Sequence, residues 1–197
     1  MQKRHLLPTS SCCSAAISAY AKAEQWERAL RTLSEIQRQD LEADVITYSA
    51  AISACEKAEQ WEQALGILME MHQQGLEIDV ISYNAAISAC HKSGQWERAF
   101  GMVAEMRQRA SNPDVISYSA LISACEKGVQ WERALRMLLE MREQRLELDA
   151  ISYSAAISAC EIGEHWERAL GMLRELQEFG LVPTVISYNA AISACEK

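Results

Sequence analysis

The chain has 197 residues and a formal net charge of −8, with a pI near 5.1. Helix-forming residues dominate the composition, and the eight Gly and three Pro are few for the turns of a β-rich fold, so we expect an all-α protein. No apolar run approaches the roughly 18–20 residues that span a bilayer, which excludes a membrane-spanning helix. The acidic balance is unusual for a nucleic-acid-binding protein.

Residues 1–9 form a short N-terminal segment ahead of the first repeated pattern. Basic residues stand at Lys3, Arg4 and His5, but the repeat pattern is already under way by Ser14. This leaves too little chain for a signal or transit peptide, so no targeting peptide is visible. Taken alone, the sequence indicates a soluble intracellular protein.

From there on, the sequence repeats every 35 residues without insertion or deletion. Every tryptophan lies in one ladder with this spacing: Trp26, Trp61, Trp96, Trp131 and Trp166. Five tyrosines form a second ladder: Tyr48, Tyr83, Tyr118, Tyr153 and Tyr188. Self-similarity at this length predicts a solenoid of stacked supersecondary units.

Each repeat contains two helical patterns. Residues 80–92 place Tyr83, Ile87 and Cys90 on one face at helical spacing, and the second pattern runs from about Trp96 to Arg109 with apolar residues at i, i+3 and i+4. An aspartate precedes the first helix of most repeats, where an N-cap belongs. The chain therefore predicts a right-handed α-solenoid of tandem helix-turn-helix repeats.

The period divides the chain into five full repeats and a remainder. The full repeats are residues 10–44, 45–79, 80–114, 115–149 and 150–184. Residues 185–197 supply the first helix of a truncated sixth repeat. The first repeat is degenerate, since Cys13 takes the place of the tyrosine and Tyr20 that of the cysteine.

The cysteines also follow the period, at Cys55, Cys90, Cys125, Cys160 and Cys195. Packed helices lie roughly 8–10 Å apart, whereas a disulfide needs Cα atoms within about 7 Å, so we expect small buried thiols in a reducing compartment. Cysteines 35 residues apart do not have metal-ligand spacing, and no phosphate loop or nucleophile motif is present. We therefore expect no enzyme, cofactor, metal or small-molecule substrate.

Two phrases recur in order, as Val-Ile-Ser-Tyr-Asn-Ala-Ala-Ile-Ser-Ala-Cys at 80–90 and Trp-Glu-Arg-Ala-Leu-Gly-Met-Leu-x-Glu at 166–175, and repeats end in Pro-Asp, as at 113–114, or x-Asp. At this period they resemble pentatricopeptide repeats, over residues 10–197. Related tetratricopeptide repeats run 34 residues and usually bind peptides. The resemblance implies sequence-specific binding of single-stranded RNA, one base per repeat, in RNA processing, editing, stability or translation in a chloroplast or mitochondrion.

In the family, the residue after the tyrosine and the last residue of the repeat read one base together. Carried over, these reading pairs are Ser14 with Asp44, Ser49 with Asp79, Asn84 with Asp114, Ser119 with Asp149, and Ser154 with Thr184. Asn189 has no second member. The family pattern associates Ser–Asp with G and Asn–Asp with U, which implies the target 5′-GGUGN-3′. Other RNA-processing proteins are a second implied class of partner.

Two further sets lie on the same helix face. Isoleucines that can flank a base stand at Ile46, Ile81, Ile116, Ile151 and Ile186. Lysines that can face phosphates stand about three turns further along, at Lys22, Lys57, Lys92 and Lys127, whereas the fifth repeat has Ile162 there.

Plainer interpretations accompany each assignment. The aspartates can be helix caps alone, and the lysines can simply favour a helix C-terminus, where neighbouring glutamates offset their charge. The tryptophans are expected to serve packing rather than base stacking. The acidic composition favours an alternative function, a peptide-binding helical-repeat scaffold of tetratricopeptide type.

Overall fold

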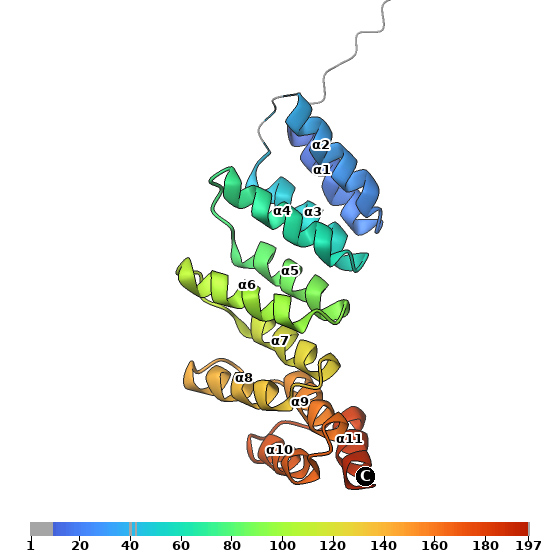
Figure 1. Ribbon diagram of the computed structural model, residues 1–197, viewed down its shortest axis with the longest axis vertical. Coiled ribbons are helices and arrows are strands. Elements are labelled where there is room, and N and C mark those ends of the chain that lie inside the picture. The colour runs from blue at the N-terminus through green and yellow to red at the C-terminus, as the bar shows by residue number, and fades with distance from the viewer. Residues whose placement is uncertain (1–9, 40, 42, 197) are drawn as a thin grey trace, which may run out of the picture. The chain divides into compact units, whose positions relative to one another are not determined.

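The computed structural model describes residues 10–39, 41 and 43–196, and the N-terminal segment expected at 1–9 lies outside them. The chain divides into two compact units, Met1–Ala89 and Cys90–Lys197. Within the described residues all regular structure is helical, as expected. Figure 1 labels the helices of each unit in chain order.

The helices alternate between two kinds, which we call A (first in a repeat) and B (second). The A helices are α1 (Ser10–Lys22), α3 (Val45–Lys57), α5 (Val80–Lys92), α7 (Val115–Lys127), α9 (Ala150–Ile162) and α11 (Val185–Glu196). The B helices are α2 (Trp26–Arg38), α4 (Trp61–Gln73), α6 (Trp96–Gln108), α8 (Trp131–Glu143) and α10 (Trp166–Glu178). The bounds expected for α5 and α6 hold to within one residue at each end.

Stacking follows the same rule in each unit. In the first unit α1 packs on α3, and α2 contacts both its own A helix and the next one. In the second unit α7 packs on α9 and α9 on α11, while α8 contacts α7 and α9. α9 is thus flanked by two A helices and covered by α8 and α10, which suits the apolar, small-residue sequence of the A helices.

The tyrosine ladder forms the centre of each core. Tyr48, Tyr83 and Tyr118 are fully buried and Tyr153 is nearly so. Their hydroxyl ends meet polar residues of the B helices: the Gln37 amide and the Tyr48 hydroxyl both donate to the Glu70 carboxylate in the first unit. In the second unit Arg107 donates to Tyr118 at 2.9 Å and pairs with Glu140 at 2.5 Å. These polar clusters satisfy the phenol groups of Tyr48 and Tyr118.

The cysteine prediction is confirmed for the interior of the array. Cys55, Cys90, Cys125 and Cys160 are free and buried. Burial raises the pKa of Cys55 and Cys125 to about 12 and that of Cys90 and Cys160 to about 11, so these thiols stay protonated. Cys195 departs from the prediction because it is exposed: no described A helix packs on the far side of α11.

The turn from each A helix to its B helix uses one left-handed residue. These positive-φ positions are Glu24, Glu59, Gly94, Val129 and Glu164. The following residue closes the turn by donating its N–H back into the A helix, as Gln130 does to the Cys125 carbonyl at 2.8 Å. Glycine occurs at only one of the five, although a β-branched residue such as Val129 is disfavoured at positive φ.

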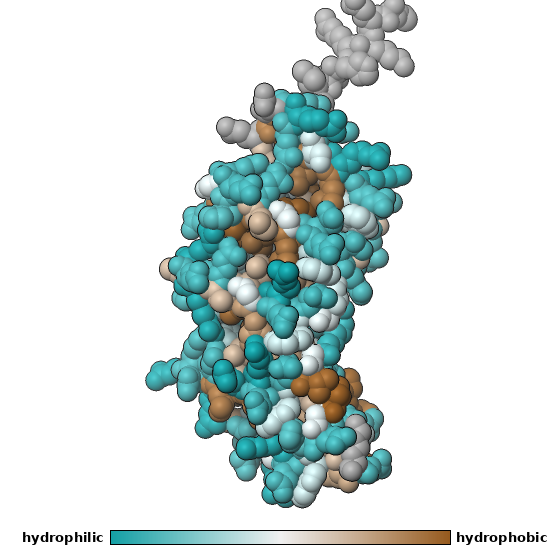
Figure 2. All heavy atoms as spheres, viewed as in Figure 1, coloured by the Kyte–Doolittle hydropathy of each residue, from teal (hydrophilic) through white to brown (hydrophobic). Residues whose placement is uncertain are grey.

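No helix in the described part of the chain is long and apolar enough to cross a membrane. The face of the second unit seen in Figure 2 is largely hydrophilic, with a hydrophobic patch over α9 and α11.

Candidate nucleic-acid interface

In each unit, a row of exposed isoleucines marks one edge of the A helices. Each is the second residue of its helix, and each is 63–69% exposed: Ile46, Ile81, Ile116, Ile151 and Ile186. Large apolar side chains are usually buried, and a row of this regularity is not scattered surface. Within each unit the row provides repeated apolar surfaces beside the sequence-predicted reading residues.

The reading serines lie three residues further along the same helices. Ser14, Ser49 and Ser119 are half-buried, and Ser154 is buried at 6% exposure. Three of these hydroxyls donate to the carbonyl one turn back in their own helix: Ser49 to Val45 and Ser119 to Val115 at 2.8 Å, and Ser154 to Ala150 at 2.6 Å. Their protons are therefore already engaged.

The reading aspartates are helix N-caps. The Oδ1 atom of Asp44 accepts from the Thr47 N–H at 2.9 Å, and that of Asp79 accepts from the Ser82 N–H at 2.8 Å. Asp149 caps α9 in the same way, through the Ser152 N–H at 2.7 Å. The capping interpretation is confirmed, but these cap bonds use Oδ1, so Oδ2 is the oxygen left to accept from a ligand.

A buried Thr or Ser links the two members of each described pair within one unit. It is the third residue of the next A helix: Thr47 joins Ser14 to Asp44, Ser82 joins Ser49 to Asp79, Ser152 joins Ser119 to Asp149, and Ser187 joins Ser154 to Thr184. Ser82 and Ser152 contact the reading serine through the hydroxyl and the aspartate through the backbone N–H. The four are fully buried. The sequence contains this Ser or Thr in every repeat from the second onward, but its position before the buried tyrosine gave no sign of a link across repeats.

In the fifth pair, Ser154 and Thr184, the two side chains contact each other directly. Thr184 caps α11 with its hydroxyl instead of a carboxylate, at 3.1 Å from the Ser187 nitrogen. It also lies 3.0 Å from the Ser154 hydroxyl. Because Ser154 is buried and a hydroxyl has one proton, this pair has less polar capacity left for a ligand than a Ser–Asp pair.

The remaining predicted residues fall into two groups. Asn84 is half-buried in the first unit, and Asp114 caps α7 in the second unit, where its Oδ1 accepts from the Ser117 N–H at 2.9 Å. Asn189 is exposed on α11. Their base-reading role stays a prediction, as it does for the other pairs.

Lysines and glutamates lie next to one another in sequence near the C-terminal ends of the A helices, so their charges offset each other. Lys22, Lys57 and Lys127 are exposed and Lys92 is half-buried, yet the Lys127 ammonium donates to the Lys92 carbonyl at 2.6 Å. The acids beside them bond to the next repeat: Glu56 accepts from Ser88 at 2.9 Å and Glu161 from Ser193 at 2.6 Å. Burial raises the pKa of the corresponding Glu126.

His91 replaces this glutamate in the third repeat. Its Nδ1 atom is buried with no hydrogen-bond partner among the described residues. Burial and the neighbouring Lys127 lower the pKa of the imidazole, so His91 is neutral at pH 7 and adds no cation to the face.

The tryptophans pack against the following repeat. Trp96 lies so close to Gly128 that a Cβ atom there would collide with the indole, and the Arg133 guanidinium sits 4.7 Å from the ring centroid. Trp131 stacks obliquely on His165 with ring centroids 4.0 Å apart. The packing role is observed at these two steps, although Trp26 to Trp131 are only half-buried and Trp166 is 49% exposed.

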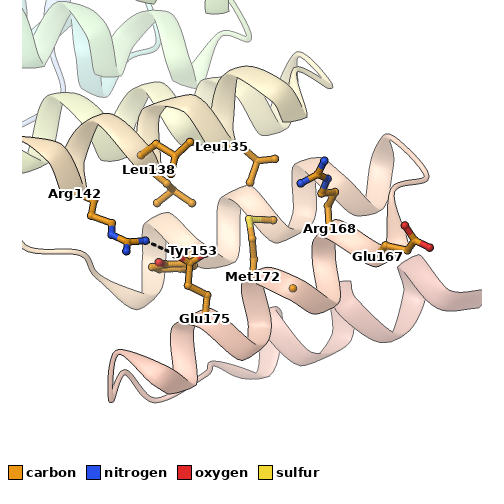
Figure 3. A pocket seen from close by; sticks show the side chains of 10 residues that line it. Leu135, Leu138, Arg142, Tyr153, Glu167, Arg168, Met172 and Glu175 are labelled. Atoms are coloured by element: carbon orange, nitrogen blue, oxygen red, sulfur yellow. Dashed lines mark hydrogen bonds and ion pairs between the residues drawn. The ribbon is translucent and has the colours of Figure 1, made fainter.

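An apolar cavity of about 380 Å³ opens between α8, α9 and α10. Figure 3 shows Leu135, Leu138 and Met172 along its wall and the Arg142–Glu175 ion pair, 3.2 Å long, at one end. None of the reading residues or exposed isoleucines lines it. In residues 10–196, apart from 40 and 42, no cluster of His, Cys, Asp and Glu could hold a metal ion.

Repeated hairpins, aligned caps and an exposed isoleucine at the start of each A helix from the second repeat onward define a tandem helical-repeat protein. The chain belongs to the PPR repeat family: matches to the family described as "PPR repeat family" cover residues 43–90, 78–127 and 113–162, and matches to "PPR repeat" cover 11–41 and 151–181. No curated protein sequence matches the chain.

Solved structures share the fold at low identity. The crystal structure of the pentatricopeptide repeat protein PPR10 from maize is 24% identical with a TM-score of 0.72, over 98% of this chain. PPR10 in complex with an 18-nt psaJ RNA element is 19% identical with a TM-score of 0.77, over 96% of this chain. This chain spans only 28% of PPR10 in either structure.

The PPR domain of the Arabidopsis thaliana protein-only RNase P 1, in complex with tRNA, is 13% identical with a TM-score of 0.79. Here the match covers 93% of this chain and 96% of that domain. At these identities the structures support the repeat fold itself.

Proposed function

We propose that this protein binds single-stranded RNA, one base per repeat, along the edge of the A helices that carries the exposed isoleucines. One observation carries the proposal: each exposed isoleucine stands beside a linked pair of polar reading residues, repeated at every described step within a unit. Ile46 and Ile81 flank the Ser49–Asp79 pair in sequence, and Ile116 and Ile151 flank Ser119–Asp149. A base slotted between apolar side chains presents its Watson–Crick edge to such a pair.

The hydrogen-bonding capacity of the Ser–Asp pairs favours guanine. The Ser49 proton is donated to the Val45 carbonyl, so its oxygen offers lone pairs, and the Asp79 Oδ2 offers more. Guanine alone among the four bases presents two adjacent donors, N1–H and N2–H, on its Watson–Crick edge. A pair of acceptors complements those donors and leaves other bases with an acceptor facing an acceptor.

The Asn84–Asp114 pair has a different capacity. An amide supplies a donor as well as an acceptor, while a carboxylate accepts only. Uracil presents the N3–H donor flanked by carbonyl acceptors, which this combination can satisfy. In repeat order, and with the RNA parallel to the chain, the pairs give 5′-GGUGN-3′, where the Ser154–Thr184 pair leaves the fifth base open.

Affinity rests mainly on base contacts, because the charge is unfavourable. The net charge is −8, and the lysines of the face have glutamates as neighbours. With about four lysines near phosphates, the log–log salt slope should be shallow, on the order of −3. Binding by five repeats is accordingly expected to be weak but selective.

The cellular role proposed is that of an RNA-binding adaptor without catalytic activity of its own, in processing, editing, stability or translation of chloroplast or mitochondrial RNA. The RNA complexes of PPR10 and of the protein-only RNase P 1 domain support this direction, since both share the repeat fold. Other RNA-processing proteins are proposed as partners that supply catalysis.

Selection from a random RNA pool at stated ionic strength tests the proposal. We expect enrichment of GGUG, a preference for a GGUG oligonucleotide over its scrambled control, and a shift from U toward G at the third base in Asn84→Ser. Equal binding of the two oligonucleotides at low salt would refute base reading. Binding of basic peptides without any RNA binding would establish the peptide scaffold instead.

A further inference from the structure

We propose that the buried hydroxyl at the third residue of each A helix is a positioning residue for base reading by the preceding repeat. This inference rests on the proposed RNA-binding function. Thr47, Ser82, Ser152 and Ser187 never touch the RNA in this scheme. They fix the direction in which the reading serine presents its remaining lone pair to the base.

The first unit contains two such links. Thr47 Oγ1 lies 2.5 Å from the Ser14 hydroxyl and donates to Asp44 Oδ1, also at 2.5 Å. Ser82 Oγ lies 2.6 Å from the Ser49 hydroxyl, and its N–H donates to Asp79. Each link therefore runs from the reading serine of one repeat to the cap of the next helix, joining the two members of a pair.

The second unit repeats the arrangement. Ser152 Oγ lies 2.9 Å from the Ser119 hydroxyl, and Ser187 Oγ lies 2.7 Å from that of Ser154. Four links at equivalent positions, in two separately described units, are a property of the repeat rather than of one local side chain.

Counting protons settles the direction of two of these bonds. A hydroxyl has one proton, and those of Ser49, Ser119 and Ser154 go to their own helix carbonyls. Ser82 and Ser152 must then donate to Ser49 and Ser119. In both cases the serine's proton is consumed inside the protein, and the serine is left as an acceptor.

Burial explains why the link controls selectivity. Thr47, Ser82, Ser152 and Ser187 are 0% exposed, so RNA cannot reach them and they act only through the serine. Without Ser82, Ser49 keeps its hydrogen bond to the Val45 carbonyl but loses the donor that fixes the direction of its remaining lone pair. The pair would then hold the two guanine donors less precisely, and its affinity for G would fall toward that for the other bases.

The experiment compares Ser82→Ala with two matched variants. The backbone N–H of residue 82 still donates to the Asp79 side chain that caps the helix. Alanine also favours the helical conformation, so the variant retains the fold. Ser82→Thr restores a hydroxyl of the kind that Thr47 carries at the equivalent buried position. Ser53→Ala removes a half-buried serine of α3 instead. Binding is measured to four oligonucleotides that differ only in the second base.

We expect Ser82→Ala to lower the preference for G at the second base roughly threefold to tenfold, the worth of one net hydrogen bond. The loss should appear in the affinity for the G oligonucleotide, while affinity for the other three oligonucleotides stays within about twofold of wild type. Ser82→Thr and Ser53→Ala should keep the wild-type preference, and other positions of the RNA should be unaffected in all variants.

A thermal-unfolding cycle separates this inference from the proposed function. Ser49→Ala and Ser82→Ala, singly and together, should show coupled effects on stability if the link exists in solution. Additive effects overturn the inference whatever the RNA result. If the wild-type chain prefers G at the second base and Ser82→Ala keeps that preference, the inference is overturned while the proposed function stands. Failure of the wild-type chain to discriminate any base overturns both.

Discussion

The second and fifth repeats share their helices, period and core tyrosine, but differ at the groups that face a ligand. Residues 45–79 end in Asp79, whose carboxylate caps α5 through Oδ1. Residues 150–184 end in Thr184, whose single hydroxyl both caps α11 and contacts Ser154. The fold needs only the cap, which either side chain supplies.

Base recognition needs more polar atoms than capping the helix does. A carboxylate that caps with one oxygen still has the other, whereas the threonine hydroxyl is already engaged on two sides. The comparison teaches that folding and base reading compete for the same polar atoms at the end of each repeat. A residue that caps the helix can therefore fail to read a base.

The second and fifth repeats also differ in their polar groups at two other positions. Lys57 of the second repeat is replaced by Ile162, which removes a cation from the fifth. Tyr48 has Gln37 and Glu70 at its hydroxyl, whereas Tyr153 has no hydrogen-bond partner among the described residues and lines the cavity beside α8 and α10. The fifth repeat is thus regular in its backbone and reduced in its polar contacts.

Exchanging the last residues of these repeats should give the largest effect. Thr184→Asp supplies the missing acceptor, and we expect selection for G at the fifth base by roughly tenfold or more, as for a good bidentate base contact. Asp79→Thr should remove a similar selectivity at the second base. Competition binding with oligonucleotides varied at one position measures both.

Thr184→Ser serves as the control, since it keeps a hydroxyl cap and adds no carboxylate. If Thr184→Asp folds normally yet shows no base preference at the fifth position, the last residue of the repeat is a cap alone.

Removing the two tyrosine hydroxyls should have unequal effects on stability. Tyr48→Phe leaves Gln37 and Glu70 without the phenol that bridges them, and we expect a loss of about 1 kcal/mol, or a Tm lower by about 2–4 °C. Tyr153→Phe breaks no hydrogen bond between described residues and should change Tm by less. Thermal denaturation followed by circular dichroism measures the difference, and equal losses would contradict it.

The helices and their buried faces were predictable because they depend on local periodicity. Residues 80–92 predicted α5 at both ends, and the aspartates before α3, α5, α7 and α9 predicted their caps. The exposure of Ile46 and its counterparts also followed from helix geometry, because the core side of the A helix was already assigned to the tyrosines and cysteines.

What could not be predicted depends on contacts between repeats. The Ser49–Ser82 link joins residues 33 positions apart, and nothing in either local pattern distinguishes Ser82 from an ordinary helix residue. Near-identical repeats also hide the signal, since every repeat carries the same residues whether they interact or not. The exposure of Cys195 likewise depends on what packs beyond α11, not on its own sequence.

Exchanging the lysine position should give a smaller effect on RNA binding. Ile162→Lys adds one cation near the C-terminal end of α9, so the salt slope should steepen by about 0.7 if the ammonium meets a phosphate. Lys57→Ile should make it shallower by the same amount. Binding measured at several salt concentrations tests this. An unchanged slope would show that these lysines only bind helix carbonyls, as Lys127 does at Lys92.

The smallest effect expected is a difference in pH dependence between a carboxylate cap and a hydroxyl cap. Hydrogen bonds from the Thr47 hydroxyl and N–H lower the pKa of Asp44 below its ordinary 3.8. Unfolding therefore takes up a proton between the two pKa values, so the cap's contribution is complete above about pH 4 and is lost as pH falls through the lowered pKa. Asp44→Asn keeps a capping oxygen that does not titrate, and its Tm should fall less steeply than wild type below pH 4. A Thr184→Ser variant, in which no carboxylate is changed, should keep the wild-type slope. Parallel curves for wild type and Asp44→Asn would mean that the Asp44 carboxylate titrates alike in the folded and unfolded chain.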